Sequence, residues 1–443
     1  MNIHQTDPLA QNPDRSTHMP IFTLDKDPTP KDQAIYIPSV TPAYAISVLK
    51  SQWKRSLPQG ISNNDLNFLR SDNKLMRLGH VMSSAGQALN QTQDCIITTR
   101  NRKQSFVIGD SGGYQIATGK LDINGDRDRL KILHWLEKHT DAAMTLDVPT
   151  ASINNPHSKY NRFADCLKDN LEHLEFFAKH RTAGATRFLN VLQGTTTPNS
   201  DIWFDKVKHY PFEGWAFGGN LRHNFYNLCR RIIQMADQKL LQDKHWIHIL
   251  GTNTLDTAIG LTALQRAINR HINPNLRISY DTSSPFRILG QWHQVYTIPK
   301  FSAEGMTLQS AEAPDMPAYV GSDIRFPWPS QLGDILKLSD ICVVKKGFKS
   351  STYDTQSLYY LYHHNLASLC NAIALANRVF DSESIAHTHN IARPVGSLVE
   401  AINQIIKVGT MDSLNKFRGT FNAVRSIQSA DDDLDRRDLE TSK

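Results

Sequence analysis

The segment Ser105-Phe-Val-Ile-Gly-Asp-Ser-Gly-Gly-Tyr-Gln115 joins a short apolar run to a cluster of polar residues and glycines. The apolar run predicts a buried strand that ends at the carboxylate of Asp110. The glycines that follow allow the backbone to approach a flat object closely. Tyr114 can stack on such an object while Asp110 and Gln115 hydrogen-bond its edge. A heterocyclic base fits better than a phosphate, because no lysine or helix-opening glycine pattern follows.

The same order of apolar run, polar residues and helical stretch recurs along the chain. Strands are expected at residues 34–40, 105–109, 142–146, 187–192, 214–217, 246–250 and 277–280. Helices are expected at residues 126–138, 161–180, 200–209, 224–242 and 253–270. A strand followed by a helix every thirty to forty residues or so indicates parallel βα units.

Two parallel architectures fit this alternation. A doubly wound sheet concentrates functional residues at one switch point near the chain start, whereas every strand of a (β/α)8 barrel contributes to one ring. Here polar residues follow almost every strand, in the segments DSGGYQ, LDVPT, NVLQG, AFGGN, HILGT and YDTSSPFR. We therefore predict an α/β fold with a TIM-like (β/α)8 barrel. The expected divisions are a flexible segment at 1–33, the barrel at 34–304, a barrel completion and helical subdomain at 305–429, and a charged tail at 430–443.

The composition is that of an ordinary globular protein, with 40% hydrophobic and 21% charged residues. It contains no apolar run long enough to span a membrane and no secretory signal at its start. Five scattered cysteines without a CxxC pair indicate reduced thiols, so a cytoplasmic location is expected. The net charge of +6 permits a polyanionic partner.

Three acids, Asp110, Asp147 and Asp281, stand at predicted strand ends. One such aspartate alone is usually a helix cap or a turn residue. Three together with Gln193 and the Gly218-Gly219 pair favour a site for a guanine-like base. Carboxylates can accept its N1–H and N2–H₂ donors, and an amide or glycine N–H can donate to its O6. The remaining acid is then available at the sugar, where paired carboxylates carry out retaining displacement.

These segments together resemble the tRNA-guanine transglycosylase superfamily over residues 106–287, with looser similarity to about residue 408. DSGGYQ matches the family's DSGG(F/Y)Q, and NVLQG resembles its VQGG. GWAFGGN resembles G(Y/F)A(V/I)GG, and HILGT is similar to YLMGVG. YDTSSPFR resembles the D-x-x-x-P-x-R nucleophile segment, with Asp281, Pro285 and Arg287 at the matching positions.

The resemblance implies a role for each matching residue. Asp281 would be the nucleophile on the ribosyl carbon, and Asp110 the general acid and base. Tyr114 and Leu250 would lie on the two faces of the base, which must leave its stack to enter the pocket. The full set of residues implied to bind the base is Tyr114, Gln115, Asp147, Gln193, Gly218, Gly219, Leu250 and Arg287.

The sequence departs from the tRNA enzymes at the zinc site and at the pocket. The family's CxCxxC motif is missing, and Cys342 stands alone in that region. We therefore expect no cofactor. The alternative is a zinc site rebuilt from Cys370, His363, His364, His387 or His389. Thr195 replaces the second glycine of VQGG, and Asn220-Leu221 replace the acidic residue usual after the glycine pair.

These departures favour the branch that places 7-deazaguanines in DNA, the DpdA-type transglycosylases of phages and bacterial modification islands. The resemblance then implies exchange of a DNA guanine for a base such as 7-cyano-7-deazaguanine through a covalent aspartate–sugar intermediate, which protects the DNA from restriction. The implied partners are double-stranded DNA and the free base, with a homodimer or a helper ATPase possible.

Three alternative functions stay open. The first is a transglycosylase that acts on tRNA, and the second is a non-catalytic nucleic-acid-binding subunit. The presence of both Asp110 and Asp281 argues against the second. The third is a barrel hydrolase for nucleosides or sugars, in which Gln193 and the Gly218-Gly219 pair have no obvious use.

A basic segment could contact a phosphate backbone, although a solvated face is an equally good interpretation. Its lysines are Lys337, Lys345, Lys346 and Lys349, with Arg222, Arg230 and Arg231 as possible additions. The tripeptide Trp53-Lys54-Arg55 is a further candidate.

Overall fold

The structure is a computed structural model that describes residues 30–51, 53–222, 224–252, 254–344, 352–382 and 392–424. Eight parallel strands form one sheet in the order β1-β8-β7-β6-β5-β4-β3-β2. They are β1 (Ile35–Pro38), β2 (His80–Ser84), β3 (Phe106–Asp110), β4 (Ala142–Met144), β5 (Arg187–Leu192), β6 (Gly214–Phe217), β7 (Trp246–Ile249) and β8 (Arg277–Thr282). The strand order follows the sequence once around a circle.

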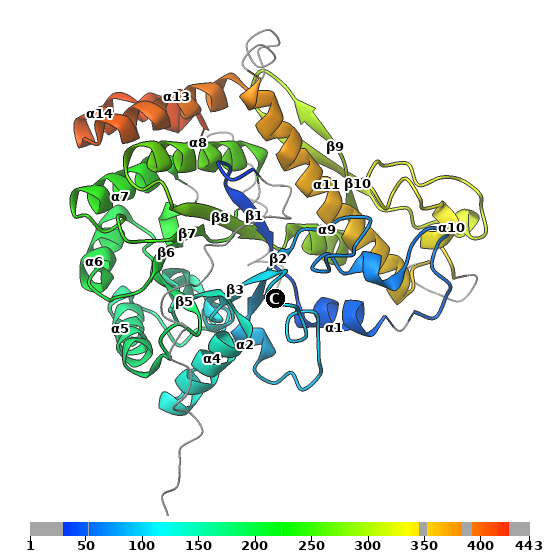
Figure 1. Cartoon of the computed structure of the whole chain (residues 1–443), viewed down its shortest axis with the longest axis horizontal. Coiled ribbons are helices and arrows are strands. Elements are labelled where there is room, and N and C mark those ends of the chain that lie inside the picture. The colour runs from blue at the N-terminus through cyan, green and yellow to red at the C-terminus, as the bar shows by residue number, and fades with distance from the viewer. Residues whose placement is uncertain are drawn as a thin grey trace, which may run out of the picture.

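The sheet closes through β1, which lies between the last strand and the second. Tyr36 is in register with Tyr280 of β8. On its other side, Ser39 bridges Met82 of β2, and the Val40 N–H donates to the Met82 carbonyl at 3.1 Å. The predicted TIM-like (β/α)8 barrel is therefore confirmed (Figure 1).

Helices surround the strands on the outside of the barrel (Figure 1). The longer ones are α1 (Pro42–Lys50), α4 (Asp126–His139), α5 (Phe163–His180), α6 (Thr197–Val207), α7 (Phe225–Asp237) and α8 (Leu255–His271). Short elements at the strand ends are η1 (Asn63–Leu66), α2 (Ala85–Ala88), α3 (Gly113–Ala117), η2 (Thr150–Asn154) and η3 (Gly219–Leu221). Thr196, Asn224 and Thr254 cap α6, α7 and α8, because each side chain accepts a backbone N–H of the first turn. Helix α7 ends at Asp237, before the predicted residue 242. Shortly after this end, Lys239 adopts a left-handed φ of 58°.

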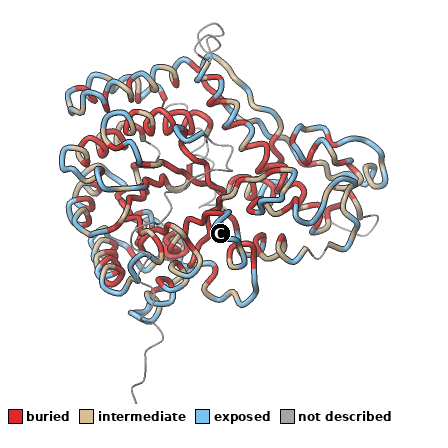
Figure 2. Tube along the Cα trace, in the orientation of Figure 1, coloured by how far each residue is buried: buried red, intermediate tan, exposed pale blue. Residues whose placement is uncertain are grey.

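The barrel interior is filled with side chains from alternate strand positions. Ile35 and Ile37 of β1 and Phe106 and Ile108 of β3 share one buried cluster with residues of β2, β4, β5, β6 and β7. Phe106 stacks on Trp246 of β7 with ring centroids 5.1 Å apart. Figure 2 shows the strands buried along their length. The interior is thus a packed core rather than a pore, and a ligand can enter only at its ends.

An extension follows the last barrel strand. It comprises α9 (Ser284–Trp292), the antiparallel pair β9 (Gln294–Phe301) and β10 (Met306–Glu312), η4 (Pro317–Tyr319), α10 (Leu338–Ile341), α11 (Thr355–Asp381), α13 (Arg393–Val408) and α14 (Met411–Lys416). Helix α13 packs on α8, while α11 contacts α8, α9 and β9 (Figure 1). The ion pair between Arg55 and Asp354 ties the chain after α1 to the start of α11, with Arg55 Nε 2.7 Å from Asp354 Oδ2. The extension is therefore anchored to α8 and to the segment that follows α1.

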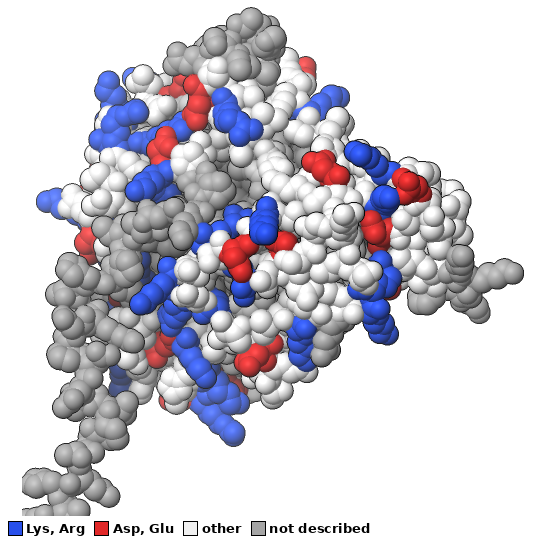
Figure 3. Space-filling view, turned by 45° about the vertical axis from the view of Figure 1, so that its right-hand side comes forward, with Lys and Arg blue, Asp and Glu red and all other residues white. Residues whose placement is uncertain are grey.

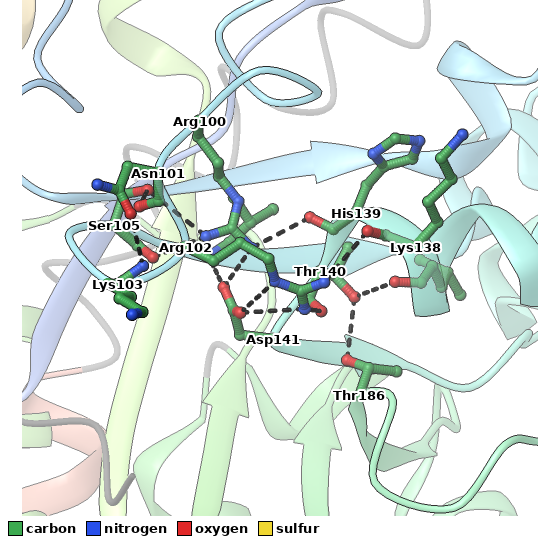
Figure 4. Close-up of polar contacts among 12 residues, drawn as sticks. Arg100, Asn101, Arg102, Lys103, Ser105, Lys138, His139, Thr140, Asp141 and Thr186 are labelled. Carbon is green, nitrogen blue, oxygen red and sulfur yellow. Dashed lines mark hydrogen bonds and ion pairs between the residues drawn. The ribbon is translucent and has the colours of Figure 1, made fainter. Parts of the chain in front are cut away.

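An ion-pair network fixes the N-terminal ends of β3 and β4 (Figure 4). Asp141 directly precedes β4, and its Oδ2 accepts from Arg100 Nη2 at 2.6 Å and from the Val107 N–H at 2.8 Å. Arg102 Nη2 lies 3.2 Å from Asp141 Oδ1. Because the Arg100 side chain is only 2% exposed, this carboxylate is the charge partner of a buried guanidinium.

Two further expectations concern membranes and thiols. None of the described helices combines the length and the apolar character that a bilayer-spanning helix needs. None of the five cysteines forms a disulfide.

Candidate functional site

The C-terminal ends of the strands bring most of the predicted residues together at the mouth of the barrel. Asp110 is the last residue of β3, and Asp281 lies near the end of β8. Asp147 follows β4 and Gln193 follows β5; their side chains hydrogen-bond directly. Because all barrel strands are parallel, their C-terminal ends lie at one mouth of the barrel, where three of these side chains come from the adjacent strands β3, β4 and β5 and the fourth from β8.

Asp281 is buried at 5% exposure and anchored through one carboxylate oxygen. Its Oδ1 accepts the Gly251 N–H at 2.8 Å and lies 3.2 Å from His248 Nε2. None of the described residues hydrogen-bonds Oδ2. The anchored carboxylate therefore keeps one oxygen available for nucleophilic attack.

Asp110 has an environment that shifts its pKa. Burial raises the pKa of this carboxyl above its ordinary value, and the negative charge of Asp281 raises it further. Hydrogen bonds from Ser84 and from the Gly112 N–H oppose the rise in pKa. An acid with a raised pKa is suited to general acid catalysis, and an acid with a free oxygen is suited to nucleophilic attack.

Asp147 and Gln193 form a buried acid–amide pair. Gln193 Nε2 donates to Asp147 Oδ2 at 2.8 Å, and the Ser111 hydroxyl donates to Oδ1 at 3.4 Å. Burial and the charge of Asp110 raise the pKa of Asp147 to about 7, although the Gln193 hydrogen bond lowers it. One N–H of the Gln193 amide is thus committed to Asp147, and its other N–H remains for a ligand.

The motif glycines make room for this pair. A Cβ atom on Gly113 would lie 2.6 Å from Asp147 Oδ1, and one on Gly218 would lie 2.8 Å from Gln193 Nε2. Gly219 has a left-handed φ of 56°, and its backbone packs against Gly194. These glycines are therefore close to side chains of the protein itself, and their approach to a flat ligand stays a prediction.

The structure gives the other predicted binding residues different surroundings, and the contacts of Arg287 with Gln291 and Trp292 are within its own helix and not with the four central side chains. Tyr114 is 61% exposed on α3, which leaves its ring free to stack, and the buried Gln115 accepts a hydrogen bond from Ser84 at 3.1 Å. Leu250 packs against the barrel-interior cluster. Arg287 lies on α9, where it contacts Gln291 at 3.4 Å and the ring of Trp292.

His248 is a residue of the site that the sequence analysis missed. It is fully buried in β7 and contacts both Asp281 and Ser279 of β8. Trp246, His248 and Leu250 occupy alternate positions, so they share the inward face of the strand. That period of two was visible in the sequence and would have placed His248 beside Leu250.

A zinc centre has no ligand set in the described part of the chain, where no group of three or more His, Cys, Asp or Glu side chains is placed to hold a metal. Cys342 donates to the Pro314 carbonyl. His364 is 2.8 Å from both Ser330 Oγ and the Tyr296 carbonyl, as expected for a satisfied core histidine. His387 and His389 lie outside the described residues.

The predicted phosphate-contacting residues are partly committed to partners within the protein. Arg230 and Arg231 both bind Asp201 at 2.7 Å, and Arg231 is only 1% exposed. The predicted phosphate contact of Arg231 is wrong, because the protein covers its guanidinium. Lys337 pairs with Asp323, and Lys345, Lys346 and Lys349 lie outside the described residues. On the face in Figure 3, the described Lys and Arg side chains form separate groups with Asp and Glu between them.

Compared with known proteins, the chain matches no protein-family model and no curated protein. The function must therefore be inferred from the side chains at the mouth of the barrel.

Proposed function

We propose that this protein is a base-exchange transglycosylase that replaces guanine in DNA with a 7-deazaguanine. The observation that carries the proposal is the pair of unlike acids at the barrel mouth. Asp281 is held through Oδ1 with Oδ2 available, and Asp110 has a raised pKa in the field of Asp281. A glycosidic bond between these acids would have a nucleophile on one side and a proton donor on the other.

The proposed exchange has two balanced halves. In the first, Asp281 Oδ2 attacks C1′, the C1′–N9 bond breaks, and Asp110 gives its proton to the departing guanine. In the second, the 7-deazaguanine nitrogen attacks C1′ and its proton returns to Asp110, while the ester bond to Asp281 breaks. No net charge or proton is consumed, and the anomeric configuration is retained by double displacement.

Guanine selection is proposed to depend on Asp147 and Gln193. The carboxyl of Asp147 can face the N1–H and N2–H₂ donor edge, and the remaining N–H of Gln193 can face an acceptor such as O6. The exposed Tyr114 supplies a stacking surface at the rim. The choice of DNA rather than tRNA follows from the sequence departures at Thr195 and Asn220 and from the missing zinc motif.

The test is base exchange by the purified protein on DNA and, separately, on tRNA. Each polymer is incubated with 7-cyano-7-deazaguanine, digested to nucleosides and analysed by mass spectrometry. A single-stranded DNA loop is included, so that no strand-opening partner is needed. Asp281→Asn keeps the acceptor for Gly251 and removes the nucleophile, and Asp205→Asn, at a 65% exposed side chain, is the matched control.

We expect the modified deoxynucleoside with wild type and Asp205→Asn and none with Asp281→Asn. Product in tRNA alone would contradict the DNA assignment and favour the classical reaction. DNA binding without product in either polymer would contradict catalysis and favour a non-catalytic subunit. Normal turnover by Asp281→Asn would refute the mechanism.

A further inference from the structure

A chain of hydrogen bonds inside the barrel leads to the proposed nucleophile. Trp246 Nε1 donates to Ser279 Oγ at 2.6 Å. Ser279 Oγ is 2.7 Å from His248 Nδ1, and His248 Nε2 is 3.2 Å from Asp281 Oδ1. The four side chains come from β7 and β8, where His248 is in register with Ser279. Ser279 and His248 are both fully buried, so water does not compete for these contacts.

The donors and acceptors of this chain fix its direction. The indole of Trp246 can only donate, so Ser279 Oγ accepts from it. An ionised Asp281 can only accept, so His248 Nε2 must carry a proton. In a neutral imidazole, Nδ1 is then the acceptor for the single hydroxyl hydrogen of Ser279. This tautomer satisfies every group, whereas a proton on Nδ1 would leave the buried Ser279 hydroxyl hydrogen without its acceptor.

We propose that His248 is a positioning residue for the nucleophile, and that Trp246 and Ser279 set its tautomer. This inference rests on the proposed function, because it assigns His248 to the same reaction. Two N–H donors, from His248 and from the Gly251 backbone, converge on Oδ1. They fix the carboxylate plane and leave Oδ2 as the attacking oxygen.

The same donors have a use in the second half of the exchange. After attack, Oδ1 is the carbonyl oxygen of the ester and can still accept both N–H groups. When the ester bond breaks, negative charge returns to the Asp281 carboxylate, and the donors stabilise it as a leaving group. His248 thereby acts in both steps without transferring a proton.

The test compares two amides that imitate different ring nitrogens. His248→Gln can place its amide N–H near the position of Nε2, whereas His248→Asn reaches only the position of Nδ1. We expect the Asn variant to lower kcat by about 10- to 100-fold, the effect of losing a charge-assisted hydrogen bond. The Gln variant should recover most of that loss, and KM for the free base should stay unchanged in both. Thermal unfolding of each variant verifies that the comparison is made between folded proteins.

An NMR measurement tests the hydrogen-bond chain without relying on activity. In protein carrying ¹⁵N-labelled histidine, the signals absent from His248→Gln belong to His248. These signals should show that Nε2 is protonated and Nδ1 is unprotonated. Ser279→Ala should shift the Nδ1 signal. A protonated Nδ1 in the wild type would overturn the proposed tautomer.

The outcomes separate this inference from the proposed function. Loss of exchange in Asp281→Asn combined with equal kcat values for His248→Asn and His248→Gln would overturn the positioning role alone. Full exchange by Asp281→Asn, or none by wild type, would overturn both.

Discussion

Replacing Asp147 with asparagine should stabilise the fold above neutral pH. In the folded protein, burial and the neighbouring charge of Asp110 raise the pKa of Asp147 from 3.8 to about 7. The unfolded chain loses this proton near pH 3.8, while the folded chain retains it up to about pH 7. The free energy of unfolding therefore falls as the pH rises through this interval, because the folded state binds more protons. Asparagine stays neutral throughout and keeps an oxygen for the Gln193 N–H.

The size of the effect follows from the difference between the two pKa values. Each pKa unit corresponds to about 1.4 kcal/mol, so the ionised carboxylate costs the fold about 4 kcal/mol above roughly pH 8. At about pH 5 the cost is only about 1.5 kcal/mol. The difference in unfolding free energy between Asp147→Asn and wild type should thus grow by about 3 kcal/mol from pH 5 to pH 8.5.

Urea unfolding of both proteins at the two pH values measures this change. Any constant effect of the substitution cancels, because only the change of the difference with pH is used. Asp243→Asn, at a 74% exposed side chain, is the control substitution of the same type. A difference that stays constant for Asp147→Asn would refute the reasoning, since the buried acid would then ionise as easily in the folded chain as in the unfolded one. The exchange assay should show weaker guanine selection in the same variant.

Three further predictions concern other parts of the molecule. Asp141→Asn should lower the free energy of unfolding by about 3 kcal/mol in urea titrations, because it leaves the buried Arg100 guanidinium without its carboxylate; an unchanged midpoint would contradict this. Gly113→Ala should slow exchange at least about tenfold, since its methyl group would lie 2.6 Å from Asp147 Oδ1 and displace the acid; wild-type kcat/KM would show that the pair tolerates the shift. Arg231→Met should leave the salt dependence of DNA binding unchanged, as the buried guanidinium is unable to reach a phosphate; a shallower slope in a salt titration would place it in the interface.

The barrel could be predicted because most of its strands are short apolar runs between amphipathic helices. Strand β2 was missed, since His80, Ser83 and Ser84 make the segment look like a polar connection. Each of its residues is nevertheless buried, and His80 Nε2 lies 2.8 Å from the Tyr36 carbonyl, so partners inside the protein replace water. A local hydrophobic pattern does not reveal such partners, which lie far away in the sequence.

The acids of the site could be predicted for a related reason, because each stands directly after a recognisable strand. The side chains that contact these acids could not be predicted from the sequence. The contact of His248 with Asp281 joins residues 33 positions apart and depends on the register between β7 and β8. Gly113 illustrates the same point, because the side chain that leaves no room for a Cβ atom there is that of Asp147, which follows the neighbouring strand β4. Both facts belong to the packed sheet and not to any single segment.

The closure of the sheet by β1 affects the order in which the chain can fold during synthesis. Strands β2 to β7 can each add to the preceding strand as it leaves the ribosome, but β1 meets β8 only after residue 282 has been made. Tyr36 and Thr282, which share a hydrogen bond, are 246 positions apart. Until residue 282 has been made, the nascent sheet has open edges that can pair with other chains. Strand β1, the first in the described part of the chain, is thus among the last to find all its neighbours.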